Sequence, residues 1–302
     1  MKIAIFGASG FVGRNIIEIF DKNGIDYIAS DIQDNPIFAM NQYQKADILK
    51  YDEVCRVLEG CDAVVHLAAH PLPASLKNPL LNARVNIEGT LNILEAMRNS
   101  DVKKIIFSSA SSIVGEVKKS PVDEEYKCQP KTPYAVSKYS IEHYLRVYHE
   151  IFDIDYLIFR FFNVYGPWQY PKSGALIPNV YKKLISQEPF TIFGDGRQTR
   201  DYIFVQDIAQ FYVYALKRNI SNELINMGTG EGTTVKDILK ISGEILGTSP
   251  KIINSPPRLG EIDNFVADIT KLKKIFRQTP QTQLRTGLEQ TFTWLRLSGE
   301  TA

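Results

Sequence analysis

Short apolar runs alternate along the chain with longer segments whose apolar residues recur at helical spacing. Residues 2–6 form an apolar run that ends at a glycine, which is typical of a buried strand. Residues 11–23 then place apolar side chains on one face of a helix, and Gly24 suits the end of that helix. The same reasoning predicts strands over 26–30, 63–68, 104–108 and 156–161, with helices over 81–99 and 134–151.

The alternation of strands and helices decides the fold class. Strands joined through helices need crossover connections, which are right-handed and place helices on both faces of a parallel sheet. We therefore predict an α/β fold with a doubly wound parallel sheet. After residue 165 turn residues become frequent, which predicts a first domain over 1–165 and a smaller lobe over 166–302. Elements near 201–228 are expected to return to the main sheet, as strands at 201–205 and 225–228.

Composition and charge narrow the classes of partner. Of the 302 residues, 44% are hydrophobic and 23% charged, and 35 basic against 34 acidic side chains leave a net charge of +1. A chain so balanced has no long-range attraction for nucleic acid or an anionic membrane, and we expect neither as a partner. The sequence contains no apolar run of about eighteen residues, so we expect no membrane span. We also expect no signal peptide, because the N-terminus lacks the pattern of one.

The cysteines indicate a compartment. Cys55, Cys61 and Cys128 are an odd number, and their spacing is not that of metal ligands. Reduced thiols in the cytoplasm explain such a set, so we predict a cytoplasmic protein without a metal site.

The first strand is followed by a glycine-containing turn. Gly7, Gly10 and Gly13 stand between that strand and the first helix, with Ser9, Phe11 and Val12 among them. Glycines there permit a tight turn, and the N–H groups at the start of the helix can bind a pyrophosphate. The spacing alone also fits an ordinary turn. Its position between a strand and a helix favours dinucleotide binding and a Rossmann-type sheet.

An acidic residue follows the second strand. Asp31 stands about twenty residues beyond the glycine turn, where a carboxylate can accept hydrogen bonds from the ribose hydroxyls of adenosine. It would repel a 2′-phosphate, so NAD is favoured over NADP as the cofactor. The alternative is a solvated loop aspartate without a ligand.

A tyrosine and a lysine begin the helix at 134–151. Tyr134 and Lys138 are four residues apart, so both lie on one face of that helix. An ammonium near the phenol is expected to lower the tyrosine's pKa from its usual value of about 10. Such a tyrosine can remove a proton from a substrate hydroxyl while hydride leaves the same carbon. The alternative is a surface pair, which many helices carry.

Together these motifs resemble those of the extended short-chain dehydrogenase/reductases, specifically the NAD-dependent nucleotide-sugar epimerases and dehydratases, and are UDP-glucose 4-epimerase-like. The similarity runs through nearly the whole chain. Besides the glycine turn and Tyr134-Ala-Val-Ser-Lys138, it includes His66-Leu-Ala-Ala69, Asn86-Ile-Glu-Gly-Thr90, Phe107-Ser-Ser109, Arg160-Phe-Phe-Asn-Val-Tyr-Gly-Pro167, Gly194-Asp-Gly-Arg-Gln-Thr-Arg-Asp201 and Val266-Ala-Asp268.

The resemblance implies which residues contact the ligands. It assigns NAD binding to residues 1–165 and nucleotide-sugar binding, with UDP expected, to the smaller lobe. Residues flanking the cofactor are expected at Gly7, Ser9, Gly10, Phe11, Val12, Asp31, Ile32, Asp47, Ile48, Leu67, Ala68, Ala69, Asn86, Ser108, Ser109, Tyr134, Lys138 and Phe161. The substrate diphosphate and nucleotide are expected at Asn163, Asn179, Arg200 and Arg258. Arginine suits phosphate because its fork is planar and always charged, although either arginine alone also fits a surface charge.

The family resemblance further implies a homodimer. The helices around 81–98 and 134–151 would form its interface, although their apolar residues could equally face the sheet.

One position departs from the family pattern. A serine or threonine is expected five residues before Gly115, and this chain has Ala110 there. Val114 also replaces the usual tyrosine. Ser111 and Ser112 are adjacent, and Ser112 stands where related sequences direct a side chain at the sugar. Either serine then supplies the catalytic hydroxyl, or the enzyme is slow, or its chemistry differs, because losing one donor to developing charge costs roughly 10²–10³ in rate.

The residues beside the catalytic pair also bear on the reaction. Dehydratases and decarboxylases of this family need an acidic side chain near the catalytic hydroxyl, where this chain has serines. A 4-reductase would favour NADPH, which Asp31 disfavours. We therefore predict a 4-epimerase acting through a transient 4-keto sugar. A nucleotide-sugar oxidoreductase, another epimerase, and a catalytically silent NAD-binding regulatory protein are the alternatives.

Overall fold

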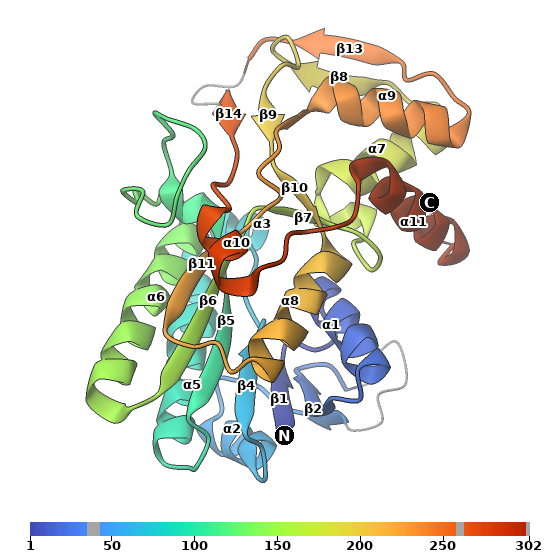
Figure 1. Cartoon of the computed structure of the whole chain (residues 1–302). Helices are drawn as coiled ribbons and strands as arrows, with labels where there is room; N and C mark the ends of the chain where they lie inside the picture. Colours follow the sequence, from blue (N-terminus) through green and yellow to red (C-terminus); the bar gives the residue numbers. More distant parts are fainter. Residues whose placement is uncertain (35–42, 258–262, 300–302) are drawn as a thin grey trace. The chain divides into compact units, whose positions relative to one another are not determined.

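The computed structural model describes residues 1–34, 43–257 and 263–299 (Figure 1). The chain forms two compact units, and each contains segments that are distant in sequence. Unit 1 consists of residues 1–115, 125–161 and 209–225. Unit 2 consists of residues 116–124, 162–208 and 226–302.

Unit 1 is built on a seven-stranded sheet. Its strands follow the order β11-β6-β5-β4-β1-β2-β3, and β1 pairs in parallel with both β2 and β4. The β2–β3, β4–β5 and β5–β6 pairs are parallel as well. The order from β3 to β6 is that of a dinucleotide-binding Rossmann sheet, so the predicted fold class is confirmed. The strands are β1 (Lys2–Phe6), β2 (Asp26–Asp31), β3 (Tyr43–Lys45), β4 (Ala63–His66), β5 (Lys104–Ala110), β6 (Asp155–Phe161) and β11 (Glu223–Met227).

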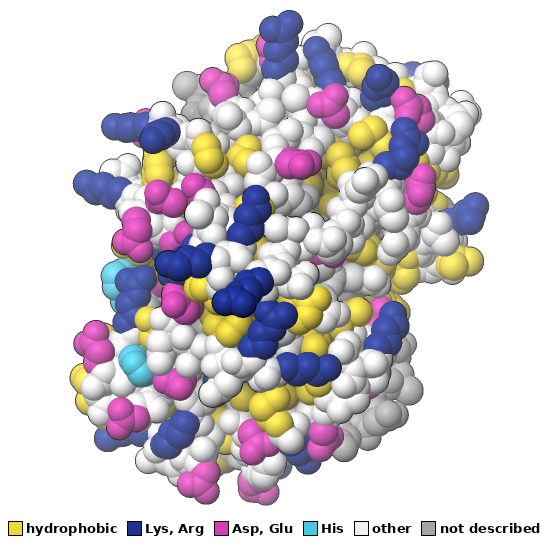
Figure 2. All heavy atoms as spheres, viewed as in Figure 1, with side chains coloured by type: hydrophobic (Ala, Val, Ile, Leu, Met, Phe, Trp, Pro, Cys, Tyr) yellow, Lys and Arg dark blue, Asp and Glu magenta, His cyan; other side chains and the backbone are white. Residues whose placement is uncertain are grey.

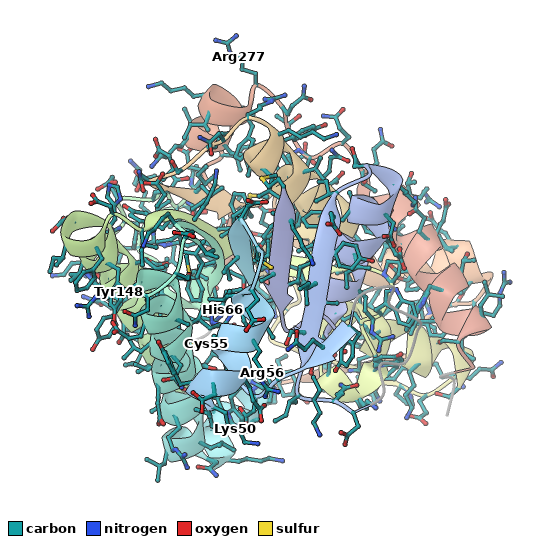
Figure 3. All side chains as sticks on the ribbon, turned by 90° about the horizontal axis from the view of Figure 1, so that it is seen from below. Lys50, Cys55, Arg56, His66, Tyr148 and Arg277 are labelled. Carbon is teal, nitrogen blue, oxygen red and sulfur yellow. The ribbon has the colours of Figure 1, made fainter. Side chains whose placement is uncertain are left out.

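Helices cover both faces of this sheet, which is why its strands are apolar on both sides. On one face Ala4 and Phe6 of β1 join a buried cluster with α2 (Tyr51–Leu58), α5 (Gly89–Arg98) and α6 (Pro133–Phe152). Figure 3 shows this face from below, with Cys55 on α2, His66 at the end of β4 and Tyr148 on α6. The other face is covered by α1 (Phe11–Lys22) and α8 (Val205–Lys217), where Phe159 packs on Tyr212.

The predicted helix over 81–99 is divided in the structure. Helices α3 (Leu72–Lys77) and α4 (Pro79–Ala83) are followed by one turn of π-helix over Arg84–Glu88, and only then by α5. Asn86 lies in that turn, nearly fully buried. Its side-chain oxygen accepts a hydrogen bond from the backbone N–H of His70. Its side-chain nitrogen donates to the His70 carbonyl and to the Ser137 hydroxyl on α6. The turn therefore fastens the chain after β4 to α6, and single π-turns of this kind are frequent at functional sites.

Helix α6 has strong signals at both ends. The Thr132 hydroxyl accepts a hydrogen bond from Ala135 N, and Pro133 occupies the first helical position. The helix ends where Asp153 adopts a left-handed conformation with φ 55°. These signals fix the first turn, on which Tyr134 lies.

Unit 2 contains three small sheets. Strands β7 and β10 pair in parallel, as do β8 and β13, while β9 lies between β12 and β14. A second buried cluster gathers side chains from α7, α9 and α11. The helices and strands of unit 2 are β7 (Asn163–Tyr165), α7 (Leu176–Ile185), β8 (Phe190–Phe193), β9 (Thr199–Arg200), β10 (Tyr202–Phe204), β12 (Thr233–Thr234), α9 (Val235–Leu246), β13 (Ile252–Ser255), β14 (Asn264–Phe265), α10 (Thr270–Phe276) and α11 (Leu284–Leu297). Short 3₁₀ turns cover Pro171–Ser173 in unit 2 and Ser111–Val114 in unit 1.

One of the two strands expected to return to the main sheet does so. Strand β11 joins it beside β6. The strand predicted at 201–205 instead forms β10 and pairs with β7, so that part of the expectation was wrong. Asp201, just before β10, is held within unit 2, because its carboxylate accepts hydrogen bonds from the backbone N–H groups of Thr229, Gly230 and Ala267.

The surface carries mixed charge. Figure 2 shows basic and acidic side chains interspersed over the visible face, in agreement with a net charge of +1. None of the helices in the described part of the chain is long and apolar enough to cross a membrane.

Candidate active site

The glycine turn after β1 leaves no space for side chains. Gly7 has φ +84°, and a Cβ built on it would lie 2.5 Å from the backbone N of Ala68 at the end of β4. A Cβ on Gly13 would lie 2.5 Å from the carbonyl oxygen of Gly7. Glycine is therefore required at both positions for the turn to fit between β1, β4 and α1.

The start of α1 is open to an anion. Gly10 is its N-cap, and within the described residues no side chain caps it and no acidic residue occupies its first turn. The first N–H groups of a helix have no partner inside the helix, so they attract a phosphate. The Ser9 hydroxyl is buried and has no hydrogen-bond partner among the described residues. These features fit the pyrophosphate of a dinucleotide.

Asp31 is fixed beside this turn. One oxygen of its carboxylate accepts a hydrogen bond of 3.0 Å from the backbone N of Ser9, and its carbonyl accepts one of 3.3 Å from the Tyr43 hydroxyl. The carboxylate therefore lies next to the turn at the end of β2. Ile32, which follows, is exposed. This placement suits the ribose of the cofactor that the sequence predicted.

Other predicted cofactor contacts lie along the same edge of unit 1. Leu67 and Ala68 donate their backbone N–H groups to the carbonyl of Phe6, which holds the end of β4 against β1. Ile48 is buried, and its carbonyl accepts from the Asn92 amide. The Asp47 carboxylate accepts a hydrogen bond from the backbone N–H of Leu49. The remaining ones lie around the turn or at strand ends: Phe11 and Val12 begin α1, Ala69 follows β4, and Phe161 ends β6.

Tyr134 and Lys138 lie together on α6, as predicted from their spacing. Lys138 is 3% exposed, and its ammonium donates a hydrogen bond of 2.6 Å to the carbonyl of Ser108 on β5. The same nitrogen lies 4.5 Å from the ring centre of Phe107 and 5.8 Å from that of Tyr134. The pair is thus anchored to the end of β5, where the catalytic hydroxyl was expected.

The pKa values of this pair differ from the expectation. Burial raises the pKa of Tyr134 to about 12, so the expected lowering by Lys138 was wrong for this structure. The ammonium points to the Ser108 carbonyl and remains 5.8 Å from the phenol ring, so the loss of solvent dominates. Burial also lowers the pKa of Lys138 to about 7, against the opposing effect of the Glu142 carboxylate.

A buried hydroxyl lies in the turn after β5. Ala110 ends the strand, and Ser111 and Ser112 begin the following 3₁₀ turn. The Ser112 Oγ is buried and has no hydrogen-bond partner in the described part of the chain. Buried hydroxyls are normally bonded, so this atom is suited to bind a ligand.

The predicted serines of β5 have other partners. The Ser108 hydroxyl donates to the carbonyl of His66, and the Ser109 hydroxyl donates to Glu142 on α6. Both hydroxyls are therefore used inside the protein. His66 itself is buried and neutral, because loss of solvent and the nearby Lys138 lower its pKa to about 3.

The sequence alone predicted no individual role for four buried residues of this region, which are Glu142, Arg160, His66 and Thr90. Glu142 and Arg160 form a buried ion pair, and His66 Nε2 lies 2.8 Å from the Thr90 hydroxyl. The one available signal was the position of Glu142, which stands four residues after Lys138 on the same helical face.

Unit 2 holds the predicted substrate residues in separate places. Asn163 donates its amide to the Asp201 carbonyl, and Arg200 donates to the Thr199 carbonyl. Asn179 lines a pocket of about 330 Å³. Arg258 lies outside the described residues.

A larger pocket in unit 2 shares two lining residues with this one. It measures about 930 Å³ and includes Arg197, Lys236 and Asp263, while Phe193 and Gln198 line both pockets. Neither Asn163 nor Arg200 appears among the described residues that line the two pockets. The described residues place no group of three or more His, Cys, Asp and Glu side chains where they could hold a metal ion.

The chain is similar in sequence to proteins of a known family. The model of the NAD dependent epimerase/dehydratase family matches residues 3–228. The chain is similar to the UDP-glucose 4-epimerase of Mycolicibacterium smegmatis, with 31% identity over 98% of this chain and 99% of the relative.

Solved structures agree over the full length. The structure of UDP-glucose 4-epimerase from Thermotoga maritima with UDP-glucose has a TM-score of 0.92 and 31% identity, and covers 99% of both chains. The structure of UDP-glucuronic acid 4-epimerase from Bacillus cereus with UDP-glucuronic acid and NAD has a TM-score of 0.88 and 33% identity, over 99% of this chain and 100% of that one.

Proposed function

Because this chain belongs to the NAD dependent epimerase/dehydratase family, we propose that it is an NAD-dependent UDP-sugar 4-epimerase. The observation that carries the proposal is the Tyr134–Lys138 pair anchored at the end of β5, in the unit that also holds the glycine turn and Asp31. An enzyme of this kind inverts the configuration at C4 of the sugar and leaves the cofactor unchanged overall.

The residues around the turn fit NAD. Gly7 and Gly13 allow the backbone to approach, the open start of α1 suits the pyrophosphate, and Asp31 suits the adenosine ribose. When bound, NAD would supply an acceptor and donor of hydride for C4 of the sugar.

The chain's own residues handle the proton. Tyr134 accepts the proton of the C4 hydroxyl and returns it when the C4 carbonyl is reduced again. The Lys138 nitrogen lies 5.8 Å from the centre of the phenol ring, where its positive charge opposes the rise in the Tyr134 pKa that burial causes. The Ser112 hydroxyl donates a hydrogen bond to the C4 oxygen, which takes over the role of the serine missing at Ala110.

Two features favour epimerisation over the other reactions of the family. The turn after β5 offers Ser111 and Ser112 where a dehydratase or decarboxylase needs an acidic side chain. Asp31 disfavours the NADPH of a 4-reductase. The named relatives and solved structures act on UDP-linked sugars, which supports UDP as the nucleotide.

We assign NAD binding to residues 1–165 and binding of the nucleotide sugar to residues 166–302. Asn179 would contact the nucleotide, because it lines a pocket in unit 2. Asn163, Arg200 and Arg258 would hold the diphosphate. Cys55, Cys61 and Cys128 are free thiols, which supports the cytoplasm as the compartment.

We further propose a homodimer through α6 and the helices before α5. Val136, Tyr144, Val147 and Ile151 are exposed and form one stripe along α6. Leu76, Leu80 and Leu81 on α3 and α4 are exposed as well; Leu81 begins the range 81–98 expected from sequence, and Leu76 and Leu80 lie just before it. Contiguous exposed apolar side chains mark interaction surfaces when they form a large patch.

The dimer is tested by size-exclusion chromatography with light scattering. Val147→Glu combined with Ile151→Glu should shift wild-type dimer to monomer, because two buried charges would lack partners in the interface. Ile253→Glu, at an exposed position of unit 2, is the matched control. A monomeric wild type would refute the proposed dimer.

The proposed activity is tested with purified protein and UDP-glucose, UDP-galactose, their N-acetyl counterparts and UDP-glucuronic acid. Sugar composition and absorbance at 340 nm are followed together. Interconversion of C4 epimers without net NADH is expected. Steady accumulation of NADH would indicate an oxidoreductase instead, and NAD binding without either change would indicate a silent binding protein.

A further inference from the structure

A charged pair lies fully inside unit 1 on the face of α6 that carries the catalytic residues. Glu142 is 0% exposed and Arg160 on β6 is 3% exposed. Arg160 Nη2 lies 2.7 Å from Glu142 Oε2, and Arg160 Nε lies 3.0 Å from Oε1. Two parallel bonds of this kind fix the direction of both side chains as well as their separation.

The same carboxylate also holds β5. The Ser109 hydroxyl donates a hydrogen bond of 2.6 Å to Glu142 Oε1. Ser109 lies opposite Arg160 in the β5–β6 register. Glu142 therefore ties α6 to two neighbouring strands at one point.

A second tie lies next to the first. Lys138 donates to the carbonyl of Ser108, the residue that precedes Ser109. Two side chains one helical turn apart on α6 thus bind two consecutive residues of β5. Tyr134 lies one further turn toward the start of the helix. A shift of α6 by one turn would displace the phenol by about 5.4 Å.

Stability alone does not account for a buried ion pair. Burying two charges removes their hydration, and replacing such a pair by apolar residues is often neutral or stabilising. Charged pairs in a core can instead select one arrangement of the elements they join. Here the elements joined are α6, β5 and β6, and the reacting side chain lies at the start of α6.

We propose that the Glu142–Arg160 pair is a positioning clamp that sets the register of α6 along β5 and so places Tyr134 and Lys138 for proton transfer. This inference rests on the proposed function. Neither residue touches the substrate in this account. Glu142 acts through Ser109 and Arg160 on the position of α6, and its carboxylate also opposes the lowering of the Lys138 pKa by burial.

A double variant separates positioning from stability. Glu142→Gln removes the carboxylate that pairs with the buried Arg160, so it is expected to lower the melting temperature. Glu142→Leu combined with Arg160→Met removes both charges and is expected to restore the melting temperature. The clamp predicts that kcat of the double variant still falls about tenfold to a hundredfold with KM for the UDP-sugar unchanged, because misplacement of about 1 Å costs on that order.

Two further measurements complete the test. Hydrogen exchange of the amides of residues 134–138 should be faster in the folded double variant than in wild type. Removal of the exposed Glu244–Arg285 pair by Glu244→Gln and Arg285→Met should leave both readouts unchanged. Wild-type kcat and wild-type exchange in the folded double variant would overturn the clamp. If wild type converts no UDP-sugar, the proposed function fails, and the exchange measurement still decides the clamp.

Discussion

The two units hold their candidate site residues in different ways. In unit 1 these residues stand at the ends of buried parallel strands or on the twenty-residue helix α6, and hydrogen bonds fix them from neighbouring elements. In unit 2 Arg200 lies on a two-residue strand, and Asn179 faces a pocket lined by several short elements. The proposed function places the chemistry at C4 in unit 1 and recognition of the rest of the substrate in unit 2, whose strands are shorter.

From this difference we expect variants in the two units to change kcat and KM in different ways. Changes in unit 1 should reduce kcat by a similar factor for every UDP-sugar, because the reacting groups are common to all of them. Changes in unit 2 should act mainly on KM, and to different extents with different sugars. Each of the following variants tests one side of that division.

The largest effect is expected at Tyr134. Tyr134→Phe removes the acid–base group, so kcat should fall about 10²–10⁴-fold with every sugar while NAD still binds. Steady-state kinetics and NAD titration measure the two parts. Tyr139→Phe on the same helix is the control. Activity retained by the Tyr134 variant would refute this residue as the base.

Ser112 is expected to follow. Ser112→Ala should lower kcat about 10²–10³-fold, because one donor to the developing charge on the C4 oxygen is lost. Ser111→Ala, next to it on the same turn, should have little effect. Adding Ala110→Ser to the Ser112 variant should restore part of the rate. Equal losses in the two single variants would contradict the preference for Ser112.

The pH dependence should report Lys138. Its pKa is lowered to about 7 by burial, so the ammonium is present below that pH and is lost as the pH rises through it. kcat/KM should then fall about tenfold per pH unit on the alkaline side. Lys138→Arg keeps its charge throughout and should remove this limb of the profile. An unchanged alkaline limb in that variant would assign it to another group.

The smallest effect is expected in unit 2. Asn179→Ala removes a polar contact worth about 0.5–1.5 kcal/mol, so KM should rise up to about tenfold while kcat stays near wild type. Gln281→Ala, at an exposed position of unit 2, is the control. A fall in kcat equal to that of the Ser112 variant would contradict the expectation that changes in unit 2 act mainly on KM.

The sequence predicted the parts of the site that depend on local spacing. Gly7 and Asp31 are marked by a turn between a strand and a helix, and Tyr134 and Lys138 by one helical turn. The doubly wound sheet followed from alternating strands and helices. Each of these patterns is contained within a short segment of chain.

The rest depended on contacts between distant segments. The partner of Glu142 is Arg160 on another element, and no spacing rule connects a helix to a strand in that way. The raised pKa of Tyr134 follows from burial, which one helix cannot reveal. Strand β10 pairs with β7 because both segments belong to unit 2, whereas its apolar sequence alone fitted the main sheet equally well.

In the proposed 4-epimerase reaction, hydride leaves C4 of the sugar and returns to the same carbon. UDP-glucose carrying deuterium at C4 tests this, with the label in the product measured by mass spectrometry and NMR. We expect UDP-galactose that retains the deuterium at C4, with no label exchanged into water. Product that has lost the label to solvent would contradict it.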